Sequence, residues 1–150
     1  MKLRIPPVLV VIVAGLLIWV ISRYVPFPSL AIPGRDLVAA SLAAVGAAVV
    51  ALGVASFNRA STTVDPLHPE QASALVVTGI YRLTRNPMYL GFAIVLLAWA
   101  VYLSAWPALI VVVAYLAYIS RFQIEPEEKA LEARFGAAFQ DYKRSVRRWL

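Results

Sequence analysis

Residues 86–120 form a stretch of 35 residues without a charged side chain. As one helix, this stretch would be about 50 Å long at about 1.5 Å per residue, well beyond a bilayer core of about 30 Å. The segment Ser104-Ala105-Trp106-Pro107 divides it, because Pro107 suits the first turn of a new helix, where a missing N–H costs nothing. We therefore expect two short membrane helices that form a tight hairpin.

Two further apolar stretches precede this one. Leu37 to Phe57 is long enough to cross a bilayer, and residues 5–21 are apolar between basic flanks. A cleaved signal peptide also has a basic start and a short apolar run, but no Ala-x-Ala cleavage site follows here, which favours an uncleaved span. The sequence therefore predicts a single all-α integral membrane domain, 1–150, with four transmembrane helices: two in residues 1–60 and the hairpin in residues 61–150.

Small residues recur in the second span. Ala40, Ala44 and Ala48 are spaced four residues apart, and Gly46 and Gly53 lie close by. Small residues at this spacing allow helices to approach closely in lipid, where apolar burial alone gives little reason to associate. We expect this alanine face to pack against another helix.

The composition agrees with a membrane protein and excludes several kinds of site. Apolar residues make up 61% of the chain and charged residues 15%, whereas soluble proteins have about 45–50% and about 25%. The absence of cysteine excludes disulfides and thiolate chemistry, and one histidine, His68, cannot form a zinc site alone. We expect no metal, and His68 is interpreted as a loop residue.

The basic residues predict the orientation in the membrane. With four spans, the N-terminus, the loop before residue 86 and the segment after residue 120 share one side, and they hold 12 of the 14 Lys and Arg residues. Basic residues accumulate on the cytoplasmic side. Both termini are therefore expected in the cytoplasm.

The polar segment after residue 120 has the pattern of cytoplasmic helices. Pro126 suits a first turn, the following Glu127 and Glu128 suit the positive end of a helix dipole, and Gly136 suits a stop. Apolar side chains then recur at helical spacing between basic ones over Ala137 to Trp149. This predicts an amphipathic helix at the membrane surface, with Phe139, Tyr142, Val146 and Trp149 on its lipid side.

Two polar motifs are the candidates for chemistry. Residues 79–91 match G-x-Y-x-x-x-R-[H/N]-P-x-Y-x-G, and residues 127–142 match E-E-x-x-L-x-x-x-F-G-x-x-[Y/F]-x-x-Y. Taken separately, each also fits ordinary helix capping and interfacial side chains. Glycine-rich nucleotide-binding motifs and an evident Ser-His-Asp set are absent from the sequence.

Together, and joined by a charge-free hairpin, the two motifs resemble the isoprenylcysteine carboxyl methyltransferase and phospholipid methyltransferase superfamily, in its bacterial type. The resemblance covers residues 73–148. It implies an S-adenosyl-L-methionine-dependent methyltransferase whose site lies at the membrane–cytosol boundary, in a bacterial inner membrane. The partners expected from this are the lipid bilayer and an amphiphilic or lipid-borne methyl acceptor.

The resemblance also implies the site residues. The cofactor-binding set comprises the stretch before the first motif, residues of that motif and the first glutamate of the pair: Ser73, Ala74, Leu75, Val76, Tyr81, Asn86, Pro87, Met88, Tyr89 and Glu127. In the prenylcysteine enzymes an arginine before the glutamate pair faces the substrate, where this chain has Gln123 in register and Arg121 two residues earlier. Arg121 and Gln123 are the candidate substrate-binding residues, and Arg121 and Glu128 the candidate catalytic residues.

The acceptor and two other functions stay open at this point. The family's prenylcysteine enzymes have histidine where this chain has Asn86, and a carboxylate acceptor is slightly favoured because it needs no deprotonation. A membrane reductase of related fold would use a nicotinamide cofactor instead. A small non-enzymatic transport or assembly protein is the other alternative, although transporters usually carry a charge within a span. Nucleic acid is not expected as a partner, since the basic residues at the end of the chain alternate with apolar ones.

Overall fold

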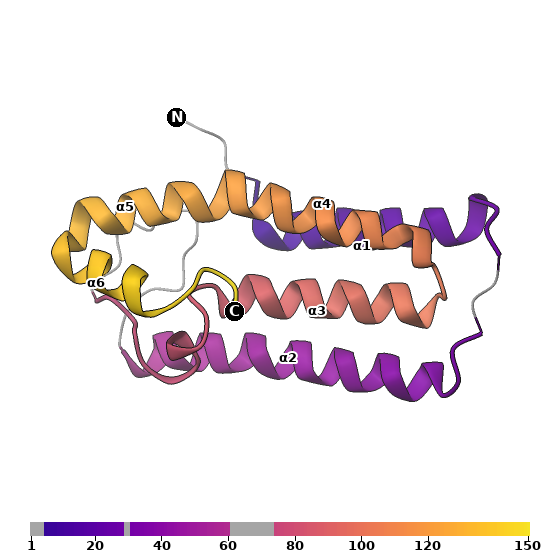
Figure 1. The fold of residues 1–150 in the computed structure, drawn as a ribbon, viewed down its shortest axis with the longest axis horizontal. Helices are drawn as coiled ribbons and strands as arrows, with labels where there is room; N and C mark the ends of the chain where they lie inside the picture. The colour runs from indigo at the N-terminus through magenta and orange to yellow at the C-terminus, as the bar shows by residue number, and fades with distance from the viewer. Residues whose placement is uncertain (1–4, 29–30, 61–73) are drawn as a thin grey trace.

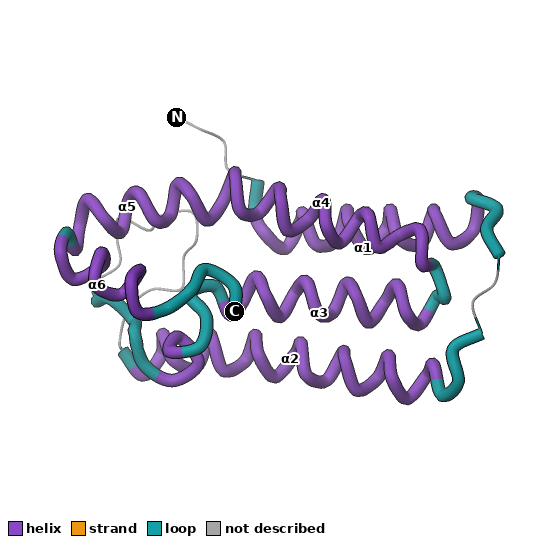
Figure 2. Tube along the Cα trace, viewed as in Figure 1, coloured by secondary structure: helices purple, strands orange, loops and turns teal. Residues whose placement is uncertain are grey.

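The computed structural model describes residues 5–28, 31–60 and 74–150, which contain helices and loops and no strand (Figures 1 and 2). His68 and Ser73 lie outside the described residues. The α-helices are α1 (Pro7–Tyr24), α2 (Arg35–Arg59), α3 (Pro87–Tyr102), α4 (Leu109–Ile119), α5 (Glu125–Phe135) and α6 (Ala137–Ser145). Short 3-10 turns are η2 (Gly79–Arg82) and η3 (Trp106–Ala108), and η4 (Ser120–Ile124) is a π-helical turn.

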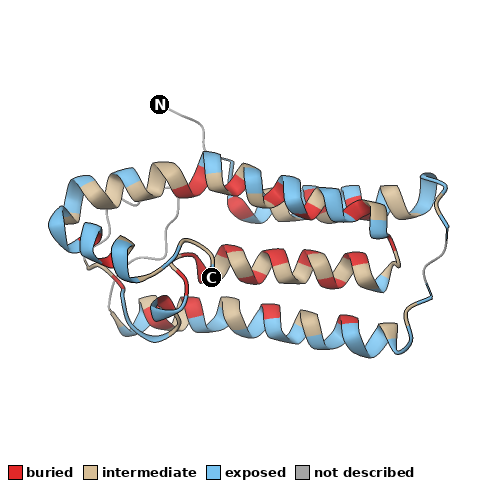
Figure 3. Cartoon of the chain, in the orientation of Figure 1, coloured by how far each residue is buried: buried red, intermediate tan, exposed pale blue. Residues whose placement is uncertain are grey.

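Within the described residues, three helices are long and apolar enough to cross a membrane: Pro7–Tyr24, Arg35–Arg59 and the continuous helix Trp106–Phe135. The outer faces of α1 and α2 expose large apolar side chains such as Leu16 and Leu52 (Figure 3). Such faces suit hydrocarbon as solvent, and the architecture fits an integral membrane protein. Helix α3 is apolar as well, but its 16 residues span only about 24 Å at 1.5 Å per residue.

Helix α3 is the central helix of the bundle (Figures 1 and 3). Helix α2 packs along one side of it, and α1 and α4 pack on the other. After Leu103 the chain turns through Ser104, which has a φ of 51°, and α4 then runs back beside α3. Pro107 lies in the 3-10 turn that leads into α4, as its position in the sequence predicts.

The face of α2 that packs on α3 differs from the predicted one. Ala40, Ala44 and Ala48 are exposed, and the buried residues are Ala39, Gly46, Gly53 and Ser56. At Gly46 the backbones of the two helices touch, since an added Cβ would lie 2.8 Å from the carbonyl oxygen of Gly91. The glycines therefore define the contact, and the alanine face is directed away from it.

The helix that carries the glutamate pair begins earlier than predicted. Helix α4 passes through the π-helical turn η4 directly into α5, so Pro126 does not start a separate helix. Proline lacks an N–H and its ring crowds the carbonyl four residues earlier, and a wider turn just before it accommodates both effects. Gly136, with a φ of 53°, ends α5 as predicted.

The amphipathic helix predicted to run from Ala137 to Trp149 is shorter and faces protein. Helix α6 ends at Ser145, and Val146 has extended backbone. Phe139 and Tyr142 are buried in a cluster with Val76 and Tyr81, where the Tyr142 hydroxyl donates a 2.7 Å hydrogen bond to the Tyr81 carbonyl. The apolar face of α6 is thus covered by the segment before α3, and lipid does not cover it.

Candidate functional site

A cavity lies at the end of the bundle where α2 ends and α3 begins. It encloses about 660 Å³ of space free of atoms, a volume that includes space open to solvent. We call it the α3–α5 cavity. Five separate parts of the chain supply its lining residues: Phe57, Ala74, Leu75, Val76, Tyr81, Arg85, Asn86, Met88, Tyr89, Glu127, Glu128, Leu131, Phe139 and Tyr142.

The turn before α3 forms one wall of the cavity. Asn86 occupies the N-cap position and Pro87 the first turn, but the Asn86 side chain makes no capping hydrogen bond. Its Nδ2 instead donates to the carbonyl oxygen of Arg148 at 2.9 Å. The Thr84 hydroxyl accepts from the Asn86 backbone N–H at 3.2 Å and is fully buried. This turn is therefore fixed by residues at the other end of the chain.

Glu127 faces Tyr89 across the cavity. The Tyr89 hydroxyl, from α3, donates to Oε2 of Glu127, from α5, at 3.2 Å. The Tyr115 hydroxyl in turn donates to the backbone carbonyl of Tyr89 at 3.4 Å. The Tyr89 hydroxyl thus holds one oxygen of the Glu127 carboxylate at the wall of the cavity.

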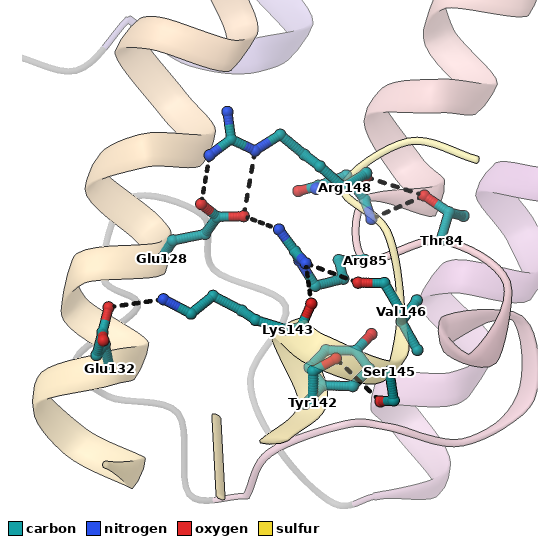
Figure 4. A network of polar contacts seen from close by, with 10 residues as sticks. Thr84, Arg85, Glu128, Glu132, Tyr142, Lys143, Ser145, Val146 and Arg148 are labelled. Atoms are coloured by element: carbon teal, nitrogen blue, oxygen red, sulfur yellow. Dashed lines mark hydrogen bonds and ion pairs between the residues drawn. The ribbon is translucent and has the colours of Figure 1, made fainter. Parts of the chain in front are cut away.

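Glu128 lies beside Glu127 but has different partners. Nη2 of Arg85 donates to Oε1 at 2.8 Å, and Nη2 of Arg148 donates to Oε2 at 2.6 Å (Figure 4). Burial opposes ionisation of Glu128, but the hydrogen bonds from Arg148 and Arg85 outweigh it and hold the pKa of this carboxyl below its usual value. Glu128 is thus a charged group neutralised by two arginines.

Arg85 connects three elements at this site. Its Nη1 donates to the carbonyl oxygens of Lys143 and Val146 at 3.1 and 2.6 Å, while Nη2 binds Glu128 (Figure 4). Within the described part of the chain, its buried Nε has no acceptor. Arg85 therefore retains one N–H donor at the wall of the cavity.

Aromatic side chains form the remaining wall. The rings of Phe57 and Tyr81 meet edge to face with centroids 5.4 Å apart, and Phe139 and Tyr142 lie beside them. Burial, reinforced by the Glu127 carboxylate and by Tyr142, raises the pKa of Tyr81, so its hydroxyl stays protonated. The cavity thus combines a carboxylate with neutral aromatic faces, which together attract a small cationic ligand.

Most of the predicted site residues line this one cavity. They are Ala74, Leu75, Val76, Tyr81, Asn86, Met88, Tyr89, Glu127 and Glu128. Pro87 is buried at the start of α3 without lining the cavity, and Ser73 lies outside the described residues.

The two candidate substrate-binding residues lie elsewhere. Arg121 does not line the cavity, its side chain is 69% exposed, and its Nη1 is ion-paired with Glu125. Gln123 is buried, and its Nε2 donates to the carbonyl oxygen of Ile5 at 2.6 Å, at the start of α1. Neither contact tests the acceptor roles expected from the sequence.

Several lining residues were missed by the sequence interpretation: Phe57, Arg85, Leu131, Phe139 and Tyr142. Arg85 belongs to the first motif, where the site was expected, but it was not named among the site residues. Phe139 and Tyr142 belong to the second motif and were assigned to the lipid side of a helix. Membership in the motifs was the signal that could have identified them. Within the described residues, no group of three or more His, Asp or Glu side chains could hold a metal ion.

Comparison with known proteins identifies relatives in sequence. The model of the phospholipid methyltransferase family matches residues 35–138, which include α2, most residues that line the α3–α5 cavity and the start of α6. An uncharacterized protein of Haemophilus influenzae is 43% identical over 63 residues, which is 42% of this chain and the whole of that protein. No solved structure matches the chain.

Proposed function

This chain belongs to the phospholipid methyltransferase family, within the isoprenylcysteine carboxyl methyltransferase-type superfamily, and from this membership we propose that it is an S-adenosylmethionine-dependent methyltransferase for an amphiphilic acceptor. One observation carries the proposal beyond the family's general activity. The two motifs, more than 35 residues apart in sequence, line a single cavity in which Tyr89 contacts Glu127.

The residues of the α3–α5 cavity suit this cofactor. When bound, S-adenosylmethionine supplies a methyl group already activated on a sulfonium. Glu127 suits the ammonium of its methionine part, and the rings of Tyr81 and Phe57 suit a cationic sulfonium. The buried Nε of Arg85 can donate to an anionic oxygen. These residues bind and orient the donor and keep water away, which is the main requirement for an in-line transfer.

We propose that the cavity lies at the cytoplasmic surface of a bacterial inner membrane, with four helices crossing and both termini cytoplasmic. Support comes from the basic residues, most of which lie at the cavity end of α2, α3 and α4 or beyond it. In a four-span arrangement, the short helices α3 and α4 would form the last two spans. The start of α3 and the end of α4, which lie beside the cavity, would then face the cytosol. An acceptor with a lipid tail would then reach the cavity from the membrane, and the cofactor would reach it from water.

Arg121 remains our proposed contact for the acceptor, and a carboxylate or similar anionic group its proposed ligand. Arg121 lies in η4, on the same continuous helix as Glu127. Its present partner, Glu125, forms an exposed pair with it, and pairs of this kind are worth less than about 1 kcal/mol. An anionic acceptor can therefore displace Glu125 and be held bidentately by the guanidinium.

Calorimetric titration of the detergent-purified protein with S-adenosylhomocysteine tests the proposal. We expect binding, and we expect Glu127→Gln to weaken it about 10- to 150-fold, equivalent to about 1.5–3 kcal/mol for a hydrogen bond to a charged group. Glu132→Gln is the matched control, because Glu132 is on the same helix, pairs with Lys143 and does not line the cavity. Binding of a nicotinamide cofactor in place of S-adenosylhomocysteine would establish the reductase alternative, and binding of neither would remove both.

A further inference from the structure

Residues 146–150, which we call the strap, leave α6 and cross to the start of α3 (Figures 1 and 4). The backbone N–H of Arg85 donates to the carbonyl oxygen of Arg147 at 3.1 Å. Nη1 of Arg85 also donates to the carbonyl oxygen of Val146. The strap is thus attached to the turn before α3 by backbone groups as well as by side chains.

Arg148 connects both walls of the α3–α5 cavity, beside the direct ion pair between Arg85 and Glu128. Its carbonyl oxygen accepts from Asn86 Nδ2 at 2.9 Å and from the Thr84 hydroxyl at 3.2 Å, on the α3 side. Its guanidinium donates to both carboxylate oxygens of Glu128, from Nε at 3.3 Å and from Nη2 at 2.6 Å, on the α5 side (Figure 4). The backbone carbonyl and the guanidinium of Arg148 therefore link the two elements whose separation sets the width of the cavity.

The strap also joins the two apolar clusters of the molecule. Val146 packs against the cluster of Val76, Tyr81, Phe139 and Tyr142 beside the cavity. Trp149 packs against the core of the helix bundle. Because the strap is anchored at both ends and in the middle, its position is determined by the folded protein.

These contacts occupy hydrogen-bonding groups of the two motifs that could otherwise bind a ligand. Both oxygens of Glu128 accept hydrogen bonds from arginines, and the Nδ2 donor of Asn86 is bonded to the strap. Glu128 is only 15% exposed, so a ligand would have to displace charge-assisted hydrogen bonds to reach it. These surroundings indicate that Glu128 positions neighbouring residues and does not itself contact the reacting atoms.

We propose that Glu128 and Arg148 are positioning residues that hold the strap across the start of α3 and thereby fix the separation of the cofactor-binding walls. The proposal rests on the proposed function of the cavity and assigns a role to residues 146–150, which lie beyond the region matched by the family. Cofactor affinity then depends on a side chain that makes no contact with the cofactor. Loss of the Arg148 guanidinium loosens the walls and speeds cofactor release.

Arg148→Gln tests the strap, with Arg147→Gln as the matched control. Both remove one positive charge and keep the backbone, but only the Arg148 guanidinium binds Glu128, whereas Arg147 is exposed. We expect Arg148→Gln to raise the KM for S-adenosylmethionine and the Kd for S-adenosylhomocysteine about tenfold, as for one charge-assisted hydrogen bond. The kcat should stay close to that of the wild type, and Arg148→Lys should recover part of the affinity. Affinity in Arg148→Gln equal to that in Arg147→Gln would overturn the proposal.

Amide hydrogen exchange provides a readout that needs no cofactor. In Arg148→Gln, residues 84–86 and 146–148 should exchange faster than in Arg147→Gln, while α1 and α2 keep their protection. Unchanged protection at residues 84–86 would overturn the strap, whatever binds in the cavity. Failure of the wild type to bind S-adenosylhomocysteine would instead defeat the proposed function, and the exchange measurement would still decide whether the strap exists.

Discussion

Gly46 and Gly91 lie against each other where α2 packs on α3. The backbone of each glycine occupies the space that a Cβ on the other glycine would need. A Cβ added to Gly91 would lie 2.6 Å from the carbonyl oxygen of Gly46, and one added to Gly46 would lie 2.8 Å from that of Gly91. Contacts shorter than 3.0 Å to backbone force the helices apart. The reciprocal glycine pair therefore sets the distance between α2 and α3, and with it the place of the turn before α3.

Gly91→Ala should destabilise the protein by about 1–3 kcal/mol, the usual cost of overpacking. Alanine is favoured over glycine in a helix by about 1 kcal/mol, so the clash must exceed that gain. Gly15→Ala is the control, because a Cβ there meets only Leu96 Cδ2 at an ordinary 4.0 Å. Thermal unfolding in detergent should show a lower midpoint for Gly91→Ala and an unchanged or higher one for Gly15→Ala. Equal midpoints would contradict a tight contact.

The contrast between the predicted and observed faces of α2 shows what sequence periodicity can and cannot provide. The apolar, charge-free run predicts the helix, because hydrocarbon demands internal backbone hydrogen bonding. It does not predict which side packs, since lipid and protein interior are equally apolar. Ala40 and Gly46 are both small, and only the position of α3 makes Gly46 the buried one.

The sequence predicted the site residues that belong to the two motifs as ligand-binding residues. It did not predict how the C-terminal segment of the chain packs against them. Tyr89 and Glu127 follow from the two motifs, and the structure brings them within hydrogen-bond distance. Phe139 and Tyr142 were misassigned because an amphipathic pattern is the same whether lipid or a protein segment covers it. The link from Arg148 to Asn86 could not have been found, since it runs through a backbone carbonyl, which has no side-chain signature.

Stability should fall in acid through Glu128. The pKa of this carboxyl is lowered in the folded protein from an ordinary value of 4.5, so its contribution is complete above pH 4.5 and is lost as pH falls through the folded pKa. Unfolding midpoints of the wild type should decrease below pH 4.5. Glu128→Gln should lower the midpoint at pH 7 and reduce the additional loss in acid. A wild-type curve matching that of Glu128→Gln at every pH would show that the Arg85 and Arg148 pairs contribute nothing.

Arg121→Lys should separate acceptor binding from cofactor binding. Lysine keeps the charge but loses the planar fork that holds an anion at two points. With the acceptor role proposed here, turnover should fall about tenfold, a barrier change of about 1.4 kcal/mol. The Kd for S-adenosylhomocysteine should stay the same, since Arg121 does not line the cavity. Equal turnover would make Arg121 a membrane anchor, and a raised Kd would place it on the cofactor side.

Reporter fusions at Leu150 and Ser104 should give opposite signals. Leu150 is the last residue of the strap, at the cavity end of the bundle, whereas Ser104 lies in the turn between α3 and α4 at the opposite end (Figure 1). The basic residues predict that Leu150 is cytoplasmic. The same signal at both positions would contradict the proposed four crossings, because α4, the proposed span between Ser104 and Leu150, would then not pass through the membrane.

In the topology proposed above, α4, η4 and α5 form one continuous helix whose first arm lies in hydrocarbon and whose second arm lies in water. Glu127 and Leu131, on one wall of the cavity, belong to the aqueous arm. Tyr89, on the other wall, belongs to α3. Helices adjust their tilt to the thickness of the surrounding bilayer at a small energetic cost. A 5° change would move the far end of the aqueous arm, which is about 16 Å long, by roughly 1.4 Å, and Glu127 by less. In that topology, bilayer thickness would act on the opening between the two walls of the α3–α5 cavity, independent of any ligand.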